Sequence, residues 1–252
     1  QVTARSQRVT YGSSVSSTPD DVYVSGLADE QQLTAIRLTP TITNVGEGRL
    51  TPSAAVVSNA DEQDVTANYD ITYTDGELTI VPKPYSEDDF KVSDIEEEYV
   101  YTGQPIEPTP AVTDLGKKLA EGTDYKVTYT DNLNVGTATM TISFEGNYSG
   151  ETTRTFRIAQ RPVTITANGQ TATYGSPIIQ DVEEAKADNL AHGHELTAIT
   201  LTPSTDQPTT EGTITPSDAV ISDANGNDVT ANYEITYKDG QLVILQKASD
   251  DL

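Results

Sequence analysis

One stretch of the sequence occurs twice and constrains the fold more than any other feature. Residues 65–80 read VTANYDITYTDGELTI, and residues 229–244 read VTANYEITYKDGQLVI. A shorter form, DYKVTYTDN, occupies residues 124–132. In each copy Tyr, Ile or Val alternates with Asp, Thr, Glu or Lys, which is the period of a half-buried β-strand. A chain with this recurring pattern is expected to fold into several β domains of related design.

The two long copies end their alternation at Asp75-Gly76 and at Asp239-Gly240. Asp-Gly is a strong hairpin signal, because a two-residue type I′ turn needs positive φ at both central residues. We therefore predict a hairpin in each copy, with its register set by the turn. In the first copy the predicted cross-strand pairs are Tyr73 with Leu78, Ile71 with Ile80, and Thr72 with Thr79.

The copies belong to larger duplicated units. Residues 50–81 match residues 214–245 at 20 of 32 positions, and Tyr11-Gly12 matches Tyr174-Gly175 further upstream. Between them lie short strand-like runs punctuated by glycine, which is typical of a β-sandwich or barrel. We predict three small β domains: the first repeat (1–83), the middle repeat (84–160) and the last repeat (161–247), with 248–252 starting a further repeat or linker.

Both joints between repeats are short and carry proline, at Val81-Pro82-Lys83-Pro84 and at Ala159-Gln160-Arg161-Pro162. Proline-bearing segments act as semi-rigid spacers. The sequence therefore predicts an elongated tandem array and not a single globule. Residues 247–252 echo residues 83–90, which suggests a window of a longer alternating array.

Composition excludes several classes of protein. The formal net charge is −24, and each repeat is acidic (−6, −8 and −10 for residues 1–83, 84–160 and 161–252). Such a field repels nucleic acid and anionic membranes and favours a soluble monomer. The absence of cysteine excludes disulfides and Cys-type zinc sites. No apolar run approaches the ~20 residues of a membrane helix, and 13 Tyr against 3 Phe predict cores whose rings carry a polar tip to the edge.

The repeats resemble two families of surface modules. The outer repeats share TYG near the start, a Gly-Leu or Asn-Leu turn, and VTANYxITYxDGxL at the end. In these features they resemble MBG-type repeats of large Gram-positive adhesins. The middle repeat resembles a bacterial immunoglobulin-like repeat in residues 99–108 (YVYTGQPIEP), 125–129 (YKVTY), 134–138 (NVGTA) and 146–150 (GNYSG).

The resemblance covers nearly the whole chain, and its motifs belong to the scaffold. It implies an immunoglobulin-like sandwich in the middle, and outer repeats that are either β-sandwiches or β-grasp-like, with a short helical turn near residues 26–33. It also implies extracellular display at a bacterial cell wall, neighbouring repeats as partners, and no enzymatic activity.

Two acidic segments are candidates for Ca²⁺ binding. Asp223, Asn225 and Asp228 partly match the order of a calcium loop, although the glycine is out of place. Asp88 and Asp89 lie next to the first joint, where a cation would stiffen the array. A turn rich in Asp, Asn and Gly is the preferred interpretation of the first segment, and a solvated acidic surface that of the second.

No catalytic constellation is evident. The two histidines, His192 and His194, fall in one predicted exposed turn, and their counterparts in the first repeat are not histidines. Nucleophilic catalysis would need a base beside a Ser or Thr. Lys126 and Lys238 alternate out of phase with the apolar positions, so both are expected to face water and not to form an intramolecular crosslink.

The sequence thus predicts a non-enzymatic stalk that holds a binding region away from a cell wall. The alternative is direct binding of host mucin, another glycan or a matrix ligand by one of the repeats. Sugar sites use exposed aromatic platforms, and Tyr23, Tyr85 and Tyr148 lie outside the alternating patterns. Calcium-dependent stiffening of the joints is a third alternative.

Overall fold

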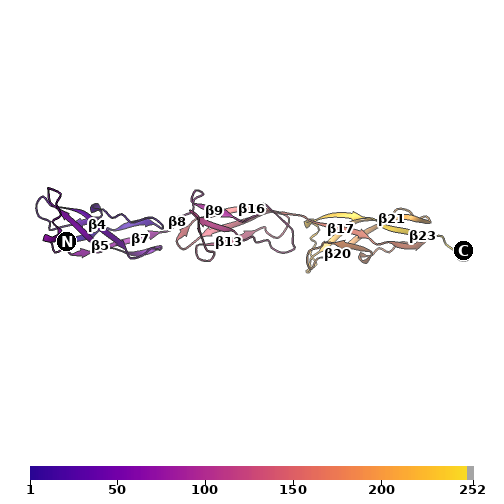
Figure 1. The fold of residues 1–252 in the computed structure, drawn as a ribbon. Helices are drawn as coiled ribbons and strands as arrows, with labels where there is room; N and C mark the ends of the chain where they lie inside the picture. The colour runs from indigo at the N-terminus through magenta and orange to yellow at the C-terminus, as the bar shows by residue number, and fades with distance from the viewer. Residues whose placement is uncertain (249–252) are drawn as a thin grey trace. The chain divides into compact units, whose positions relative to one another are not determined.

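The computed structural model describes residues 1–248 and is all-β, as predicted (Figure 1). The helical elements in that range are four single 3₁₀ turns, and no helix there has the length and apolarity needed to cross a bilayer. The 3₁₀ turns are η1 (Pro19–Asp21), η2 (Thr66–Asn68), η3 (Val182–Glu184) and η4 (Thr230–Asn232). The helical turn predicted near residues 26–33 is therefore wrong, and most of the predicted segment 248–252 lies outside the described residues.

The chain divides into two compact units. The first contains Gln1–Ser93, Ala111–Thr128 and Thr141–Thr152, and the second contains Asp94–Pro110, Tyr129–Met140 and the chain from Thr153 onward. Each unit thus holds one outer repeat together with the part of the middle repeat that packs against it. The division into three domains stays a prediction of the sequence.

The first repeat consists of two sheets. Its strands are β1 (Val2–Ala4), β2 (Gln7–Thr10), β3 (Val22–Val24), β4 (Gln32–Pro40), β5 (Gly46–Ser58), β6 (Tyr73–Thr74) and β7 (Gly76–Val81). One sheet has the order β3-β1-β6 and the other β2-β7-β5-β4. β1 pairs in parallel with β6 and β2 pairs in parallel with β7, whereas the remaining neighbours are antiparallel.

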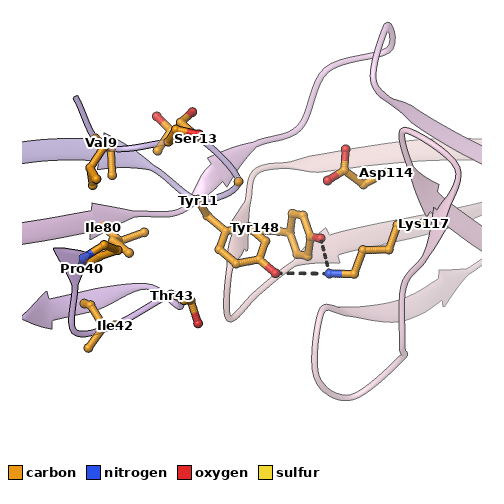
Figure 2. Close-up of a pocket in the computed structure, with 14 residues that line it drawn as sticks. Val9, Tyr11, Ser13, Pro40, Ile42, Thr43, Ile80, Asp114, Lys117 and Tyr148 are labelled. Atoms are coloured by element: carbon orange, nitrogen blue, oxygen red, sulfur yellow. Dashed lines mark hydrogen bonds between the residues drawn. The ribbon is translucent and has the colours of Figure 1, made fainter. Parts of the chain in front are cut away.

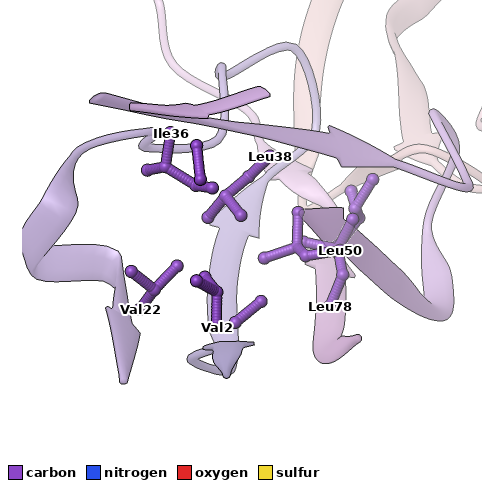
Figure 3. Close-up of a cluster of buried hydrophobic side chains, with 9 residues drawn as sticks. Val2, Val22, Ile36, Leu38, Leu50 and Leu78 are labelled. Atoms are coloured by element: carbon purple, nitrogen blue, oxygen red, sulfur yellow. The ribbon is translucent and has the colours of Figure 1, made fainter. Parts of the chain in front are cut away.

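The core of the first repeat lies between these sheets (Figure 3). β1 and β7 contribute every second residue to it, Val2 and Ala4 from β1 and Leu78 and Ile80 from β7, as the period-2 pattern requires. Burying one such aliphatic side chain contributes roughly 1.5–3 kcal/mol before the entropy cost. The buried side chains are Val2, Ala4, Val22, Ile36, Leu38, Leu50, Ala55, Leu78 and Ile80.

The predicted Asp-Gly hairpin is wrong in both outer repeats. β6 pairs with β1, whereas β7 lies in the other sheet between β2 and β5. Tyr73 and Leu78 are therefore in different sheets, and Leu78 lies opposite Gly48 while Ile80 lies opposite Gly46. The chain does not fold back at Asp75-Gly76; it crosses from one sheet to the other.

A space requirement explains the glycine at this crossing. A Cβ on Gly76 would lie 2.7 Å from the carbonyl oxygens of Ala4 and Arg5, and one on Gly240 would lie 2.6 Å from that of Ala167. Neither Gly76 nor Gly240 has a positive φ. Glycine is therefore needed for the close approach of the end of another strand, and not for a type I′ turn.

The last repeat has the same topology. Its strands are β17 (Arg161–Ala167), β18 (Gln170–Thr173), β19 (Ala185–Asp188), β20 (Glu195–Pro203), β21 (Thr209–Ser222), β22 (Tyr233–Lys238) and β23 (Gly240–Leu245). The sheets are β19-β17-β22 and β18-β23-β21-β20. Because two sheets enclose the core and no α-helix covers either of them within residues 1–248, the outer repeats are β-sandwiches and not β-grasp folds.

The middle repeat is also built from short strands. They are β8 (Lys83–Pro84), β9 (Phe90–Ser93), β10 (Glu98–Val100), β11 (Ala111–Asp114), β12 (Lys117–Lys118), β13 (Tyr125–Thr130), β14 (Gly136–Phe144), β15 (Tyr148–Ser149) and β16 (Glu151–Ala159). The sheets have the orders β10-β16-β14-β13, β12-β11-β9 and β15-β8. β10 runs parallel to β16, and β8 runs parallel to β15.

Candidate functional site

An asparagine amide connects the first repeat to the middle repeat. The Nδ2 of Asn147, in the turn before β15, donates to Oδ1 of Asn44 at 3.1 Å. Its Oδ1 accepts the main-chain N–H of Val45 at 2.9 Å. Asn44 and Val45 lie in the loop between β4 and β5, and Gly46 begins β5. One amide side chain thus pairs with two groups of an Asn-Val-Gly loop.

The joint between the middle and last repeats uses the same device. The Nδ2 of Asn232 donates to Oδ1 of Asn134 at 3.1 Å, and its Oδ1 accepts the N–H of Val135 at 2.9 Å. Asn134 and Val135 lie in the loop before β14, which starts at Gly136. The repeat types at this joint are the reverse of those at the first, yet partners and distances agree. The device is therefore local and does not depend on the type of repeat.

A pair of tyrosine rings lies beside each of these asparagines. Tyr11 and Tyr148 pack edge to face, with centroids 5.4 Å apart and planes at 80°. Tyr101 and Tyr233 do the same at 5.7 Å and 82°. Such T-shaped pairs contribute about 0.5–1.5 kcal/mol beyond the area they bury. In both joints the second tyrosine directly follows the bridging asparagine in the sequence.

The hydroxyl of Tyr233 organises the second joint. It accepts the N–H of Ala191 at 3.1 Å and lies 2.7 Å from Nδ1 of His194. Burial raises the pKa of Tyr233, so the phenol stays protonated. The imidazole of His194 also lies 6.0 Å from the ring of Tyr101. The predicted exposed turn is therefore only half right: His192 is exposed, whereas His194 packs into the joint.

An open pocket of about 540 Å³ lies at the first joint (Figure 2). Its apolar wall includes Val9, Pro40, Ile42 and Ile80 of the first repeat. Polar groups reach it from both repeats. The remaining lining residues are Thr10, Tyr11, Gly12, Ser13, Ser14, Val15, Thr43, Asp114, Lys117 and Tyr148. A volume of this size, with apolar walls and a few polar groups, is in the range of small-ligand sites.

Lys117 is the cation of this pocket. Its Nζ donates to the hydroxyls of Tyr11 at 3.2 Å and Tyr148 at 3.5 Å, as the dashed lines in Figure 2 mark. The hydrogen bonds to Tyr11 and then Tyr148 raise the pKa of Lys117 above its ordinary value, so the ammonium persists at neutral pH. The pocket therefore combines an ammonium group with two phenol hydroxyls. This arrangement suits a ligand rich in hydroxyl or carboxylate oxygens.

A second lysine holds the start of the middle repeat. Lys83 on β8 donates to Asp114 at 2.5 Å and pairs with Asp89 at 2.9 Å, and its side chain is 16% exposed. Burial lowers the pKa of Lys83, but the bonds to Asp114 and Asp89 outweigh it and the net shift is upward. Asp89, predicted as a candidate Ca²⁺ ligand, is thus paired with Lys83. Asp88 is exposed in the turn that precedes β9.

The three tyrosines predicted for glycan binding are not brought together at one surface. Tyr23 on β3 is 60% exposed, with the Arg5 guanidinium 3.8 Å from its ring centroid. Tyr85 stacks on Phe144 at 5.2 Å, and its hydroxyl is buried with no hydrogen-bond partner among the described residues. Tyr148 is 2% exposed. It belongs to the core at the pocket wall, so the premise that it lies outside the core was wrong.

The calcium-like segment forms a turn that binds itself. Asp223 accepts the N–H groups of Asn225 and Asn227 at 2.9 Å, and Asp228 accepts that of Thr230 at 2.9 Å. The side-chain bond from Asn227 is the main cause that lowers the pKa of Asp223. Asp223 and Asp228 line a hollow at the second joint with His194. Within residues 1–248 no three acidic or histidine side chains are grouped closely enough to hold a metal ion.

The joint residues were missed at the sequence level, although a signal was present. Asn-Val-Gly occurs at residues 44–46 and 134–136, and Asn-Tyr occurs at residues 68–69, 147–148 and 232–233. Short polar repeats of this kind read as turns. Their recurrence at the edges of repeats of different type was the available clue to a shared contact.

Lys126 and Lys238, which the alternating pattern predicted to face water, are both exposed.

Comparisons with known proteins find only distant similarity. No protein-family model matches the chain, and no curated protein matches it. Among solved structures, a protocadherin gammaB7 EC3-6 cis-dimer is similar with 10% identity and a TM-score of 0.24, over 98% of this chain and 72% of that chain. The protocadherin gammaB4 extracellular domain is similar with 10% identity and a TM-score of 0.22. That match covers 81% of this chain, which spans 39% of the protocadherin's length.

Proposed function

We propose that this chain is a non-enzymatic, load-bearing stalk segment of an extracellular adhesin on a Gram-positive cell wall. In this proposal the repeats transmit force between a distal binding region and the cell. Proline-bearing joints limit the contact between repeats to their ends, and the acidic surface of every repeat opposes their collapse onto one another.

The observation that carries the proposal is the parallel pairing of strands near the start of each repeat with strands near its end. In the first repeat β2 is parallel to β7, and in the last repeat β17 and β18 are parallel to β22 and β23. Because such strands point the same way, tension applied to the two ends of a repeat slides them past each other. All hydrogen bonds of the pair then resist together, instead of opening one at a time.

The middle repeat follows the same rule. β10, near its start, is parallel to β16 at its end, with Glu98 opposite Arg157 and Val100 opposite Ala159. A salt bridge of 3.3 Å links the Glu98 and Arg157 side chains. The shear arrangement is thus present in repeats of both types, which supports a mechanical role more than a role in chemistry.

Force spectroscopy tests the proposal. The chain lacks cysteine, so the pulling tethers can be attached at chosen positions through introduced cysteines. Pulling on the two ends should require high force for every repeat. Pulling on Glu195→Cys and Ser222→Cys, which face each other at one end of an antiparallel pair, should peel the strands at clearly lower force. Equal forces in the two geometries would contradict the load-bearing role.

Solution scattering tests the extended arrangement that a stalk needs. A compact globule of this length would have a radius of gyration near ~18 Å, whereas three separated repeats should give roughly 30 Å. A value near the smaller figure would exclude a stalk.

A second function, glycan binding, is favoured by the pocket at the first joint. There the Lys117 ammonium and the Tyr11 and Tyr148 hydroxyls face a hollow with one apolar wall. These groups can bind the hydroxyls or a carboxylate of a sugar, whose apolar face would lie on the wall. Of the predicted glycan tyrosines, Tyr148 is the one at this pocket.

A glycan array probed with the full chain tests this second function. If a glycan binds, Lys117→Ala should weaken binding at least about tenfold, because a hydrogen bond to a charged group contributes about 1.5–3 kcal/mol. Lys118→Ala is the matched control, since Lys118 is exposed on the same short strand and does not line the pocket. A blank array, or equal losses in the two variants, would reject the pocket as the glycan site.

A further inference from the structure

Three residues are the same in the first and last repeats but differ in burial. Ala191, Asn232 and Tyr233 of the last repeat are 5%, 6% and 3% exposed. Their counterparts Ala28, Asn68 and Tyr69 are exposed, exposed and half-buried. The last repeat buries these side chains under the middle repeat. The first repeat presents the same set, which we call the Asn68–Tyr69 face, to the surroundings.

The Asn68–Tyr69 face is already organised for contact. The hydroxyl of Tyr69 accepts the N–H of Ala28 at 3.0 Å and donates to Oε1 of Gln31 at 2.6 Å. Tyr233 makes the equivalent bonds to Ala191 and His194. The tyrosine ring is thus held in place without a partner, which lowers the entropy cost of binding one.

The residues that cover this face in the last repeat define what fits it. They are the ring of Tyr101, the side-chain oxygen of Asn134 and the main-chain N–H of Val135. The first joint presents the same three groups, from Tyr11, Asn44 and Val45, to the next Asn-Tyr pair. One set of donors, acceptors and rings therefore serves both joints.

We propose that the Asn68–Tyr69 face is a docking surface for another β repeat that carries a tyrosine and an Asn-Val-Gly loop. That repeat would dock by the end with which the middle repeat contacts the last repeat. The Asn68 amide would donate to the loop asparagine and accept the valine N–H, while Tyr69 packs edge to face on the incoming tyrosine. This inference rests on the contacts at the two joints and not on the stalk proposal.

A second copy of this chain is a poorer occupant. Its last repeat offers Tyr174, which is 45% exposed. At the positions of Asn44 and Val45, however, that repeat carries Gln207 and Pro208. Proline has no N–H to donate to the Asn68 oxygen. The last repeat therefore lacks one of the three groups that dock at both joints.

The test is a chain extended at its N-terminus by a second copy of residues 82–163, so that the added repeat meets the first repeat as the resident middle repeat meets the last. Two substitutions at exposed positions of the added copy, Lys118→Arg and Thr137→Ser, give its peptides masses different from those of the resident middle repeat. Hydrogen exchange is then measured at the N–H of Val135 in both copies. We expect the added Val135 to be protected like the resident one, at least about tenfold more than in the variant below.

The decisive variant is Asn68→Ala in the extended chain, which should remove protection from the added Val135 and leave the resident one unchanged. Asn232→Ala should do the reverse. The N–H of Leu119, bonded inside the middle repeat to the Val112 oxygen, reports that the added copy has folded. An added Val135 that exchanges freely in a folded copy would overturn the proposal. So would concentration-dependent dimers of the unextended chain that Asn68→Ala abolishes, because a second copy would then be the occupant.

Discussion

Lys83 shows how one buried charge can hold a strand in place. Its ammonium lies between Asp114 and Asp89, and the Asp114 side chain is only 12% exposed. Replacing Lys83 with Met leaves that carboxylate without its cation, which should cost about 1–3 kcal/mol. Urea unfolding measures the loss. Lys126→Met, at an exposed lysine of the same repeat, should change stability by less than about 0.5 kcal/mol. Similar losses in both variants would show that the pair contributes nothing.

The same lysine gives a pH dependence with a defined sign. The pKa of Lys83 is raised in the folded state, above the value of about 10.4 that lysine has when unfolded. The stabilisation is therefore fully present below pH ~10.4 and is lost as the pH rises through the higher folded value. The stability difference between the native chain and Lys83→Met should stay constant from neutral pH to about 10 and shrink above it. A difference that shrinks on acidification towards pH 6 would contradict this assignment.

The tyrosines show what residue types alone could and could not predict. Rings with a polar tip at the edge were expected, and the hydroxyls of Tyr73 and Tyr237 accept main-chain N–H groups of Ala55 and Ala219. The burial of Tyr233 was not predictable from its own segment. Its counterpart Tyr69 has the same neighbours in sequence and is more exposed, because burial there depends on another repeat.

At the scale of strands, the crossing at Gly240 is the most sensitive point of the last repeat. An added methyl group would meet the carbonyl of Ala167, a backbone atom that cannot move aside. Gly240→Ala should therefore destabilise the last repeat by about 2–4 kcal/mol. Gly169→Ala is the matched control, since its nearest neighbour would be at an ordinary 3.5 Å. Thermal melts compare the two, and equal melting temperatures would contradict the space requirement.

This crossing also explains why the predicted hairpin was wrong. The alternation of residues 65–80 and the Asp-Gly pair are local signals, and both agreed with a hairpin. Which sheet a strand joins depends on distant segments: β6 pairs with β1, and β7 inserts between β2 and β5. The period predicted strand β22 of the last repeat and the strands after each glycine, but in the first repeat only Tyr73–Thr74 of the segment before Gly76 is a strand. The partners of these strands were not predictable.

The joints should respond to loss of a single amide. Asn147→Ala removes the bonds to Asn44 and Val45 but leaves the cores of both repeats intact. Exchange of the Val45 N–H should accelerate about tenfold, with little change in the melting temperature of the repeats. Asn225→Ala, in an exposed turn, should leave Val45 unaffected. A large fall in melting temperature would mean that Asn147 is a core residue and not a joint residue.

For the whole molecule, the net charge of −24 predicts a response to salt. Screening shortens the range of self-repulsion from about 30 Å at 0.01 M to below 8 Å at 0.5 M. Raising NaCl over this range should increase the melting temperature by a few degrees, about 2–5 °C. A chain insensitive to salt would contradict this. An extra shift with Ca²⁺ at equal ionic strength, reversed by a chelator, would support the calcium alternative at Asp223 or Asp88.

Pro208 gives the last repeat an end unlike that of the first. A module fused behind it would meet the Tyr174 ring but no valine N–H at the loop, so its rotation about the chain axis would be unconstrained by that bond. Bending and twisting would then concentrate at this one point. The double substitution Gln207→Asn and Pro208→Val would restore the missing N–H and so fix the rotation of a module fused at this end.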